Sequence, residues 1–145
     1  MMNIDEVKQY LSQYYYLSQR IDSLKEEYHC LEVLADGTQG INYEPKAHMQ
    51  PSGKAPFIRY LDKLEKKRRK IDEKIEELLD LKEEIEETIA TVDDPVMELV
   101  LTYRYINCYD WTDIAKKLHY TESYLFKLHR KALSLVKVKD DSKRQ

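Results

Sequence analysis

The 145-residue chain has the length of one domain or of two small ones. Only three glycines and four prolines occur against 35% charged residues, which excludes a sheet-rich fold and favours helices. No run approaches the roughly 20 apolar residues that span a bilayer, and the N-terminus has no signal-peptide core. The two cysteines, Cys30 and Cys108, give no disulfide framework. We therefore predict an all-α cytoplasmic protein without membrane contact, with both cysteines reduced.

The first predicted element is a long helix over about residues 4–34. Apolar residues recur there at steps of three and four, which is the period of one helix face. These positions are Ile4, Val7, Leu11, Tyr14, Leu17, Ile21, Leu24, Tyr28 and Leu31. The pattern ends after Leu34.

A loop is predicted over residues 35–56. It contains all three glycines and three of the four prolines. Because loops of this length are usually functional or disordered, we expect part of it to be disordered. Two turn-forming stretches, 42–45 (NYEP) and 50–53 (QPSG), are candidate contact points.

A second long helix, over residues 57–92, carries a heptad pattern. Its seam positions are Phe57, Leu61, Leu64, Arg68, Ile71, Ile75, Leu78, Lys82, Ile85, Ile89 and Val92, interrupted only by Arg68 and Lys82. Residues 1–92 are therefore predicted to form a long antiparallel helical hairpin, or coiled coil. One side of each seam stays exposed in such a hairpin, which favours a homo-oligomer formed through it. The basic run 65–70 lies among acids and is interpreted as a solvated, ion-paired face.

Residues 93–139 are predicted to form a three-helix subdomain. Asp94 is a suitable N-cap and Pro95 a suitable first residue for a helix that continues to Ile106 and is broken by residues 107–108. Its predicted apolar positions are Val96, Leu99, Val100, Tyr103 and Ile106. Asp110 is expected to cap a helix over 111–118, and Thr121 a helix that ends at about 136–138. Residues 140–145 are predicted to be a disordered tail.

A helix of about eight residues, a turn at 119–120 and a longer basic helix is the arrangement of a helix-turn-helix. Ala115 is small where the two helices must cross. The predicted shared core is Ile114, Leu118, Leu125, Leu128 and Leu135. An ordinary corner between two helices is the alternative interpretation.

The charge distribution indicates where this subdomain would contact a polyanion. Residues 116–139 carry seven basic side chains against one acid, Glu122. Short polar groups at the tip of the second helix could reach base edges, whereas lysine and arginine would neutralise phosphates. The predicted DNA-binding residues are Thr121, Glu122, Ser123, Phe126, Lys127, Arg130, Lys131, Lys116 and Lys117.

Three segments carry a resemblance to known families: 101–107 (LTYRYIN), 111–118 (WTDIAKKL) and 128–133 (LHRKAL). They resemble the region-4 helix-turn-helix of sigma factors and, within that class, the phage late-operon regulators of the ArpU and RinA type. The resemblance implies a sequence-specific regulator of transcription that binds double-stranded DNA, encoded by a phage or prophage and acting in a bacterial host cell. His119 departs from this pattern, because many helix-turn-helix proteins have glycine there. The turn is therefore expected to need a positive φ angle, which histidine tolerates.

Other function classes find less support in the sequence. There is no glycine-rich phosphate loop, nucleophile elbow or His-Glu-x-x-His pattern, so we predict neither enzymatic activity nor a cofactor. His29 and Cys30 lack a second pair at zinc-finger spacing, so no metal site is predicted. One alternative is a protein-interaction module that contacts RNA polymerase or another protein. Another is a structural coiled-coil protein whose basic tail is incidental.

Overall fold

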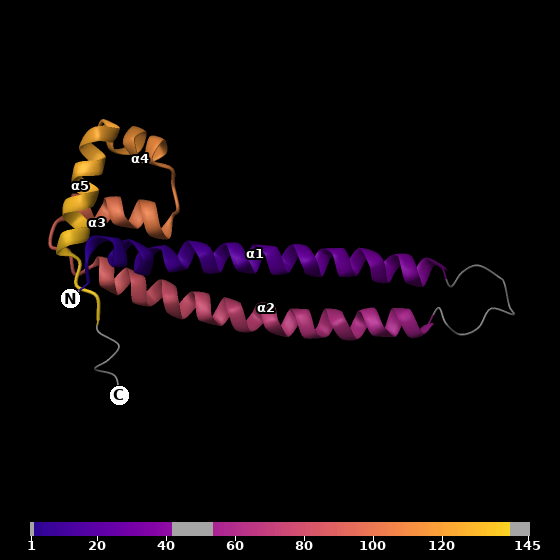
Figure 1. Cartoon of the computed structure of the whole chain (residues 1–145). Coiled ribbons are helices and arrows are strands. Elements are labelled where there is room, and N and C mark those ends of the chain that lie inside the picture. The colour runs from indigo at the N-terminus through magenta and orange to yellow at the C-terminus, as the bar shows by residue number, and fades with distance from the viewer. Residues whose placement is uncertain (1, 42–53, 140–145) are drawn as a thin grey trace, which may run out of the picture. The chain divides into compact units, whose positions relative to one another are not determined.

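The computed structural model describes residues 2–41 and 54–139. All regular elements in these two ranges are helical, which confirms the all-α prediction (Figure 1). They are α1 (Ile4–Ile41), α2 (Lys54–Ile89), α3 (Pro95–Leu101), the π-helix η2 (Thr102–Ile106), α4 (Trp111–Leu118) and α5 (Glu122–Leu135). None of the described helices has an apolar stretch long enough to cross a membrane.

The chain divides into two compact units. One unit combines Met1–Leu17 with Leu78–Gln145, and the other is Ser18–Glu77. The first unit therefore contains the beginning of α1, the end of α2 and all the shorter helices. The second contains the rest of α1, from Ser18 onward, and α2 as far as Glu77.

The predicted register of α1 is confirmed, because all nine predicted positions are buried or half-buried. The helix starts with a capping box, in which the Asn3 Oδ1 accepts from the Glu6 N–H at 2.8 Å and the Glu6 carboxylate accepts from the Asn3 N–H at 3.3 Å. In the second unit, Ile21, Leu24 and Ala35 are buried.

Both predicted boundaries of the loop, residues 35 and 56, are wrong. Residues 35–41 continue α1, and 54–56 already belong to α2. A Cβ atom added at Gly37 would meet nothing within 4 Å, so this glycine occupies an ordinary helical position. It destabilises the helix only modestly relative to alanine. Pro56 lies in the first turn of α2, where a backbone N–H has no helical partner. The candidate contact points at 42–45 and 50–53 lie outside the described residues.

The seam of α2 is confirmed at most positions but not at Leu61 and Arg68. Leu61 is 46% exposed, and Arg68 is exposed and pairs with Glu65 at 2.8 Å on its own helix. Burial falls one residue earlier, at Tyr60 and Lys67. Lys67 faces α1, where its ammonium group binds the Glu27 carboxylate at 2.7 Å.

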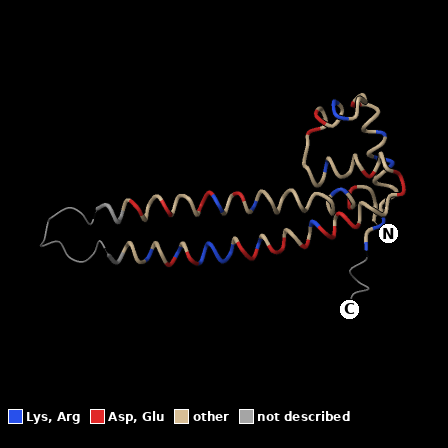
Figure 2. Tube along the Cα trace, turned by 180° about the vertical axis from the view of Figure 1, so that it is seen from behind, with Lys and Arg blue, Asp and Glu red and all other residues tan. Residues whose placement is uncertain are grey.

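The basic run on α2 is ion-paired, as predicted. Besides the Lys67 pair, the Lys66 ammonium lies 3.2 Å from Asp62 and the Arg69 guanidinium 3.1 Å from Glu65. Hydrogen bonds from Arg68 and Arg69 lower the pKa of Glu65. Figure 2 shows basic and acidic residues mixed along this helix.

The start of α3 follows the prediction, but its buried face does not. The Asp94 Oδ1 accepts from the Met97 N–H at 3.0 Å, and Pro95 is the first helical residue. Val96 and Leu99, two of the apolar positions that the predicted helix runs through, are 36% and 37% exposed. The buried side chains of α3 and η2 are Met97, Val100, Leu101 and Tyr105.

The π-helix explains part of this difference. The Asn107 N–H donates to the Thr102 carbonyl, five residues back, instead of four. The extra residue in this turn changes which side chains face the core, so Tyr105 is buried and Tyr103 only half-buried. The helix ends at Asn107 and Cys108, as predicted, and Cys108 has a φ of 58°.

The first unit has one main core, formed by residues from the beginning of α1, the end of α2 and the shorter helices. It consists of Val7, Leu11, Ile85, Ile89, Val92, Met97, Leu101, Tyr105, Ala132 and Leu133. Leu135 was predicted to belong to the shared core of the helix-turn-helix but is 46% exposed. It is the last residue of α5, and the backbone becomes extended at Val136, so the buried face ends with Ala132 and Leu133.

Candidate nucleic-acid interface

The turn between α4 and α5 is built around a left-handed residue. His119 ends α4 with a φ of 58° and a ψ of 40°, which agrees with the positive φ predicted for this turn residue. The N–H of Tyr120 then donates to the Ala115 carbonyl at 3.1 Å. Asp110 occupies the N-cap position of α4 as predicted, although its side chain makes no capping hydrogen bond.

The start of α5 is fixed by two side-chain hydrogen bonds. The Thr121 hydroxyl oxygen accepts from the Tyr124 N–H at 3.1 Å, which confirms the predicted N-cap. The Thr112 hydroxyl donates to the Glu122 carboxylate at 2.9 Å, which connects the first turn of α4 to the first turn of α5. The Glu122 carboxylate is therefore held in place while it stays exposed.

A small apolar core lies beneath the two helices. Val100, Ile114 and Leu125 are completely buried there, and Ala115 and Leu118 pack against them. Ile114, Leu118 and Leu125 therefore contribute to the core as predicted. Leu128 packs against the main core of the unit instead.

All nine predicted DNA-binding residues are exposed. Along α5, Ser123, Phe126, Lys127 and Arg130 follow one another at the spacing of one helix face. Lys116 and Lys117 lie in the last turn of α4. The Lys117 ammonium lies 4.8 Å from the centre of the Tyr109 ring, so this lysine already has an aromatic partner.

Basic side chains on α5 differ from those on α2 in their surroundings. Within residues 2–41 and 54–139, Lys127, Arg130 and Lys131 form no ion pair with a carboxylate, and neither does Lys116. Helices α4 and α5 together contain five basic residues and two acids. Their positive charge is therefore available to an external anion.

An aromatic cluster supports the exposed face of α5. The Trp111 ring lies edge-on to Phe126 at 5.3 Å and to His129 at 4.6 Å between ring centroids. The Arg104 guanidinium lies over the Trp111 ring at 4.8 Å. Phe126 is nevertheless 47% exposed, so one side of its ring remains accessible. Trp111 and Arg104 were not among the predicted site residues, although both lie in segments that carry the family resemblance.

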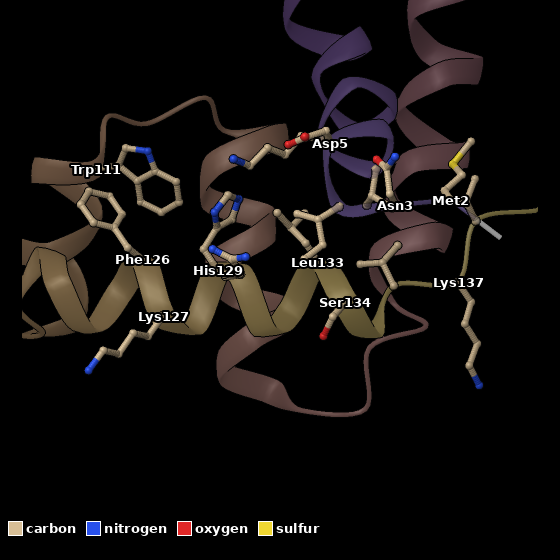
Figure 3. Close-up of a pocket in the computed structure, with 16 residues that line it drawn as sticks. Met2, Asn3, Asp5, Trp111, Phe126, Lys127, His129, Leu133, Ser134 and Lys137 are labelled. Atoms are coloured by element: carbon tan, nitrogen blue, oxygen red, sulfur yellow. The ribbon is translucent and has the colours of Figure 1, made fainter.

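A groove of about 1240 Å³ runs along α5. Its residues on α5 are Phe126, Lys127, His129, Arg130, Leu133 and Ser134, and the first residues of α1 form the opposite wall. Figure 3 shows Phe126, His129 and Leu133 in a row along α5, with Met2, Asn3 and Asp5 across from them. Sequence reasoning missed this wall, because nothing in the local pattern of residues 2–8 predicts proximity to α5.

His129 forms part of the groove and is buried, with 7% of its surface exposed. Its Nε2 lies 2.7 Å from the Tyr105 hydroxyl. Burial lowers the pKa of His129 to about 4, and the positive charges of Lys8 and Arg104 act in the same direction. Burial also raises the pKa of Tyr105 to about 12. Both groups are therefore neutral at pH 7.

Comparisons with protein-family models, curated proteins and solved structures found no significant match to this chain. A functional assignment therefore depends on the geometry and charge of the residues described above.

Proposed function

We propose that this protein is a sequence-specific, double-stranded DNA-binding regulator of transcription in which α4 and α5 form a helix-turn-helix. The observation that carries the proposal is the exposed basic face of α5, whose cations have no carboxylate partner in the described part of the chain. The left-handed turn at His119 and the resemblance to phage late-operon regulators of the ArpU and RinA type point in the same direction.

In this proposal α5 is the recognition helix and enters the major groove. Ser123 and Glu122 lie at its N-terminal end, where side chains of such helices reach base edges. The Glu122 carboxylate accepts hydrogen bonds only, so it would favour cytosine, which presents an amino group. Lys127, Arg130 and Lys131 would contact phosphates and fix the position of the helix on the duplex.

Helices α1 and α2 are proposed to form an antiparallel hairpin through which the chain associates with a second copy. Several large apolar side chains on these helices are exposed, including Tyr16 at 69%, Ile58 at 62% and Leu79 at 59%. A dimer would present two recognition helices to half-sites about 34 Å apart, one turn of the duplex. Sedimentation of the purified protein measures its oligomeric state directly.

The proposed function is tested by selecting random duplex DNA with the purified protein and measuring affinity between about 50 and 200 mM salt. The variant Lys127→Ala with Arg130→Ala should lose most of its affinity for DNA, because two phosphate contacts are removed. Each contact contributes about 0.9 to the dependence of the affinity on salt. The salt slope, log K against log salt concentration, should therefore decrease by about two. The circular dichroism spectrum should stay unchanged.

The chain offers a matched control. Lys66→Ala with Arg69→Ala removes one lysine and one arginine at the same spacing, from side chains that are 76% and 72% exposed. Both belong to surface ion pairs on α2, so little stability is lost. This control should bind DNA like the unaltered protein. Equal loss in both variants would mean only a general effect of charge, and wild-type-like binding by the α5 variant would refute the proposed face.

A second candidate function is protein binding, with RNA polymerase as one partner. Val96 and Leu99 on α3, each more than a third exposed, are the observation that favours it. Binding to polymerase without enrichment of any DNA sequence would support this alternative. An enriched sequence with a steep salt slope would support the regulator.

A further inference from the structure

The groove along α5 joins basic residues that are far apart in the sequence. Lys8 comes from the second turn of α1, Lys127 and Arg130 from α5, and Lys137 from the segment after α5. The groove also contains one acid, Asp5, on the α1 wall. Figure 3 shows Lys127 and Lys137 at the rim, extending away from Trp111 and Asp5.

These four basic side chains have no carboxylate partner among residues 2–41 and 54–139. Lys139 is a useful contrast, because it lies just outside the groove and its ammonium group is 3.7 Å from the Glu87 carboxylate. Lys8 lines the groove from α1, and its positive charge contributes to the lowered pKa of His129. Four uncompensated cations facing one space favour an anionic ligand.

The size and lining of the groove indicate an extended ligand. At about 1240 Å³ it exceeds the roughly 300–1,000 Å³ of typical pockets for small molecules. Lys127 and Lys137 lie toward opposite ends of the groove in Figure 3, and the lining between them includes the buried apolar side chain of Leu133. A phosphate backbone has this combination of length and regularly spaced negative charge.

We propose that this groove holds the sugar-phosphate backbone of the DNA duplex that α5 reads, and that Lys8 and Lys137 are DNA-contacting residues. The inference rests on the proposed function, and it extends the interface from the helix-turn-helix onto the beginning of α1. Contacts of this kind fix the register of a recognition helix without reading the sequence. Asp5 opposes the phosphates and limits affinity at this wall.

The experiment compares three single variants in duplex binding: Lys8→Ala, Lys137→Ala and, as a matched control, Lys25→Ala. Lys25 is also an exposed lysine of α1 but belongs to the other compact unit. Lys8→Ala and Lys137→Ala should each reduce the salt slope by about one and leave the selected DNA sequence unchanged. Lys25→Ala should change neither quantity. Asp5→Asn should have the opposite effect and increase affinity.

The outcomes separate this inference from the proposed function. If Lys8→Ala and Lys137→Ala bind like Lys25→Ala, while Lys127→Ala with Arg130→Ala loses binding, the groove does not hold DNA although the regulator assignment stands. If the unaltered protein selects no duplex, both proposals fail. Because all four single substitutions are at exposed positions, thermal unfolding midpoints within a few degrees of the wild type will exclude misfolding as the cause.

Discussion

His129 should make the stability of this protein depend on pH. Its imidazole is buried against the Trp111 ring and the Tyr105 hydroxyl, and the nearby charges on Lys8 and Arg104 are both positive. Burial disfavours the protonated form of the ring, and the two positive charges act in the same direction. The pKa in the folded protein is therefore lowered from its ordinary 6.5 to about 4.

The sign of the effect follows from proton binding. Between pH 6.5 and about 4, unfolded His129 binds a proton and folded His129 does not, so stability is highest above pH 6.5 and decreases as the pH falls toward 4. At about 1.4 kcal/mol for each pKa unit, the difference between the unfolded and folded pKa values of His129 limits its contribution to the free energy of unfolding to roughly 3 kcal/mol. Glu27 and Glu65 act in a different window, because their pKa values are lowered from 4.5 by Lys67 and by Arg68 with Arg69. Their contribution is present above pH 4.5 and is lost only below it.

The assay is urea unfolding at intervals between pH 7.5 and 4.5 for the wild type and for His129→Gln. The wild type should lose much of the His129 contribution to its free energy of unfolding between pH 7.5 and 4.5. The variant should be less stable at pH 7.5, and its free energy of unfolding should depend much less on pH. His29→Gln is the control, since His29 is exposed and its side chain is 76% accessible. Parallel profiles for the wild type and His129→Gln would refute the reasoning, because they would mean that His129 titrates alike in both states.

Two further substitutions test local features of the helices. Gly37→Ala should stabilise the end of α1 by about 0.5–1 kcal/mol, because the added methyl group meets nothing within 4 Å. It should slow amide hydrogen exchange in the neighbouring residues, and faster exchange would contradict a helix at this position. Asp94→Ala should cost about 1 kcal/mol, because the Met97 N–H loses its acceptor, while Asp94→Asn keeps a suitable N-cap. Equal urea midpoints for the two Asp94 variants would show that the cap contributes no stability.

Helix boundaries in the C-terminal part were predictable because short-range chemistry sets them. Asp94 and Thr121 accept backbone N–H groups three residues ahead, and each was recognisable as a cap from the sequence. The bounds of α4 agree with the prediction, since His119 provides the left-handed residue that ends it. The exposure of the predicted DNA-binding residues on α5 was predictable from the helical spacing of its apolar residues.

The features that were not predicted depend on contacts or on backbone geometry that periodicity does not encode. The extension of α1 through Gly37 was missed because glycine in a helix is disfavoured by only about 1 kcal/mol, which tertiary packing easily offsets. The π-helix that turns Tyr105 into the core has no reliable sequence signal. The Trp111 cluster joins side chains from η2, α4 and α5, and the wall at residues 2–8 lies beside residues more than a hundred positions later in the chain.

The composition of the main core bears on how the proposed functions are connected. Met97, Leu101 and Leu133 are buried partly by Val7 and Ile85, which belong to the long helices. A segment that began at residue 93 would lose these partners and expose the apolar side chains that they cover. The proposed binding of DNA along α5 and the proposed association through α1 and α2 would therefore depend on each other. The same turns of α1 that complete the core also form the wall opposite α5, so a change in the packing of α1 would alter the groove directly.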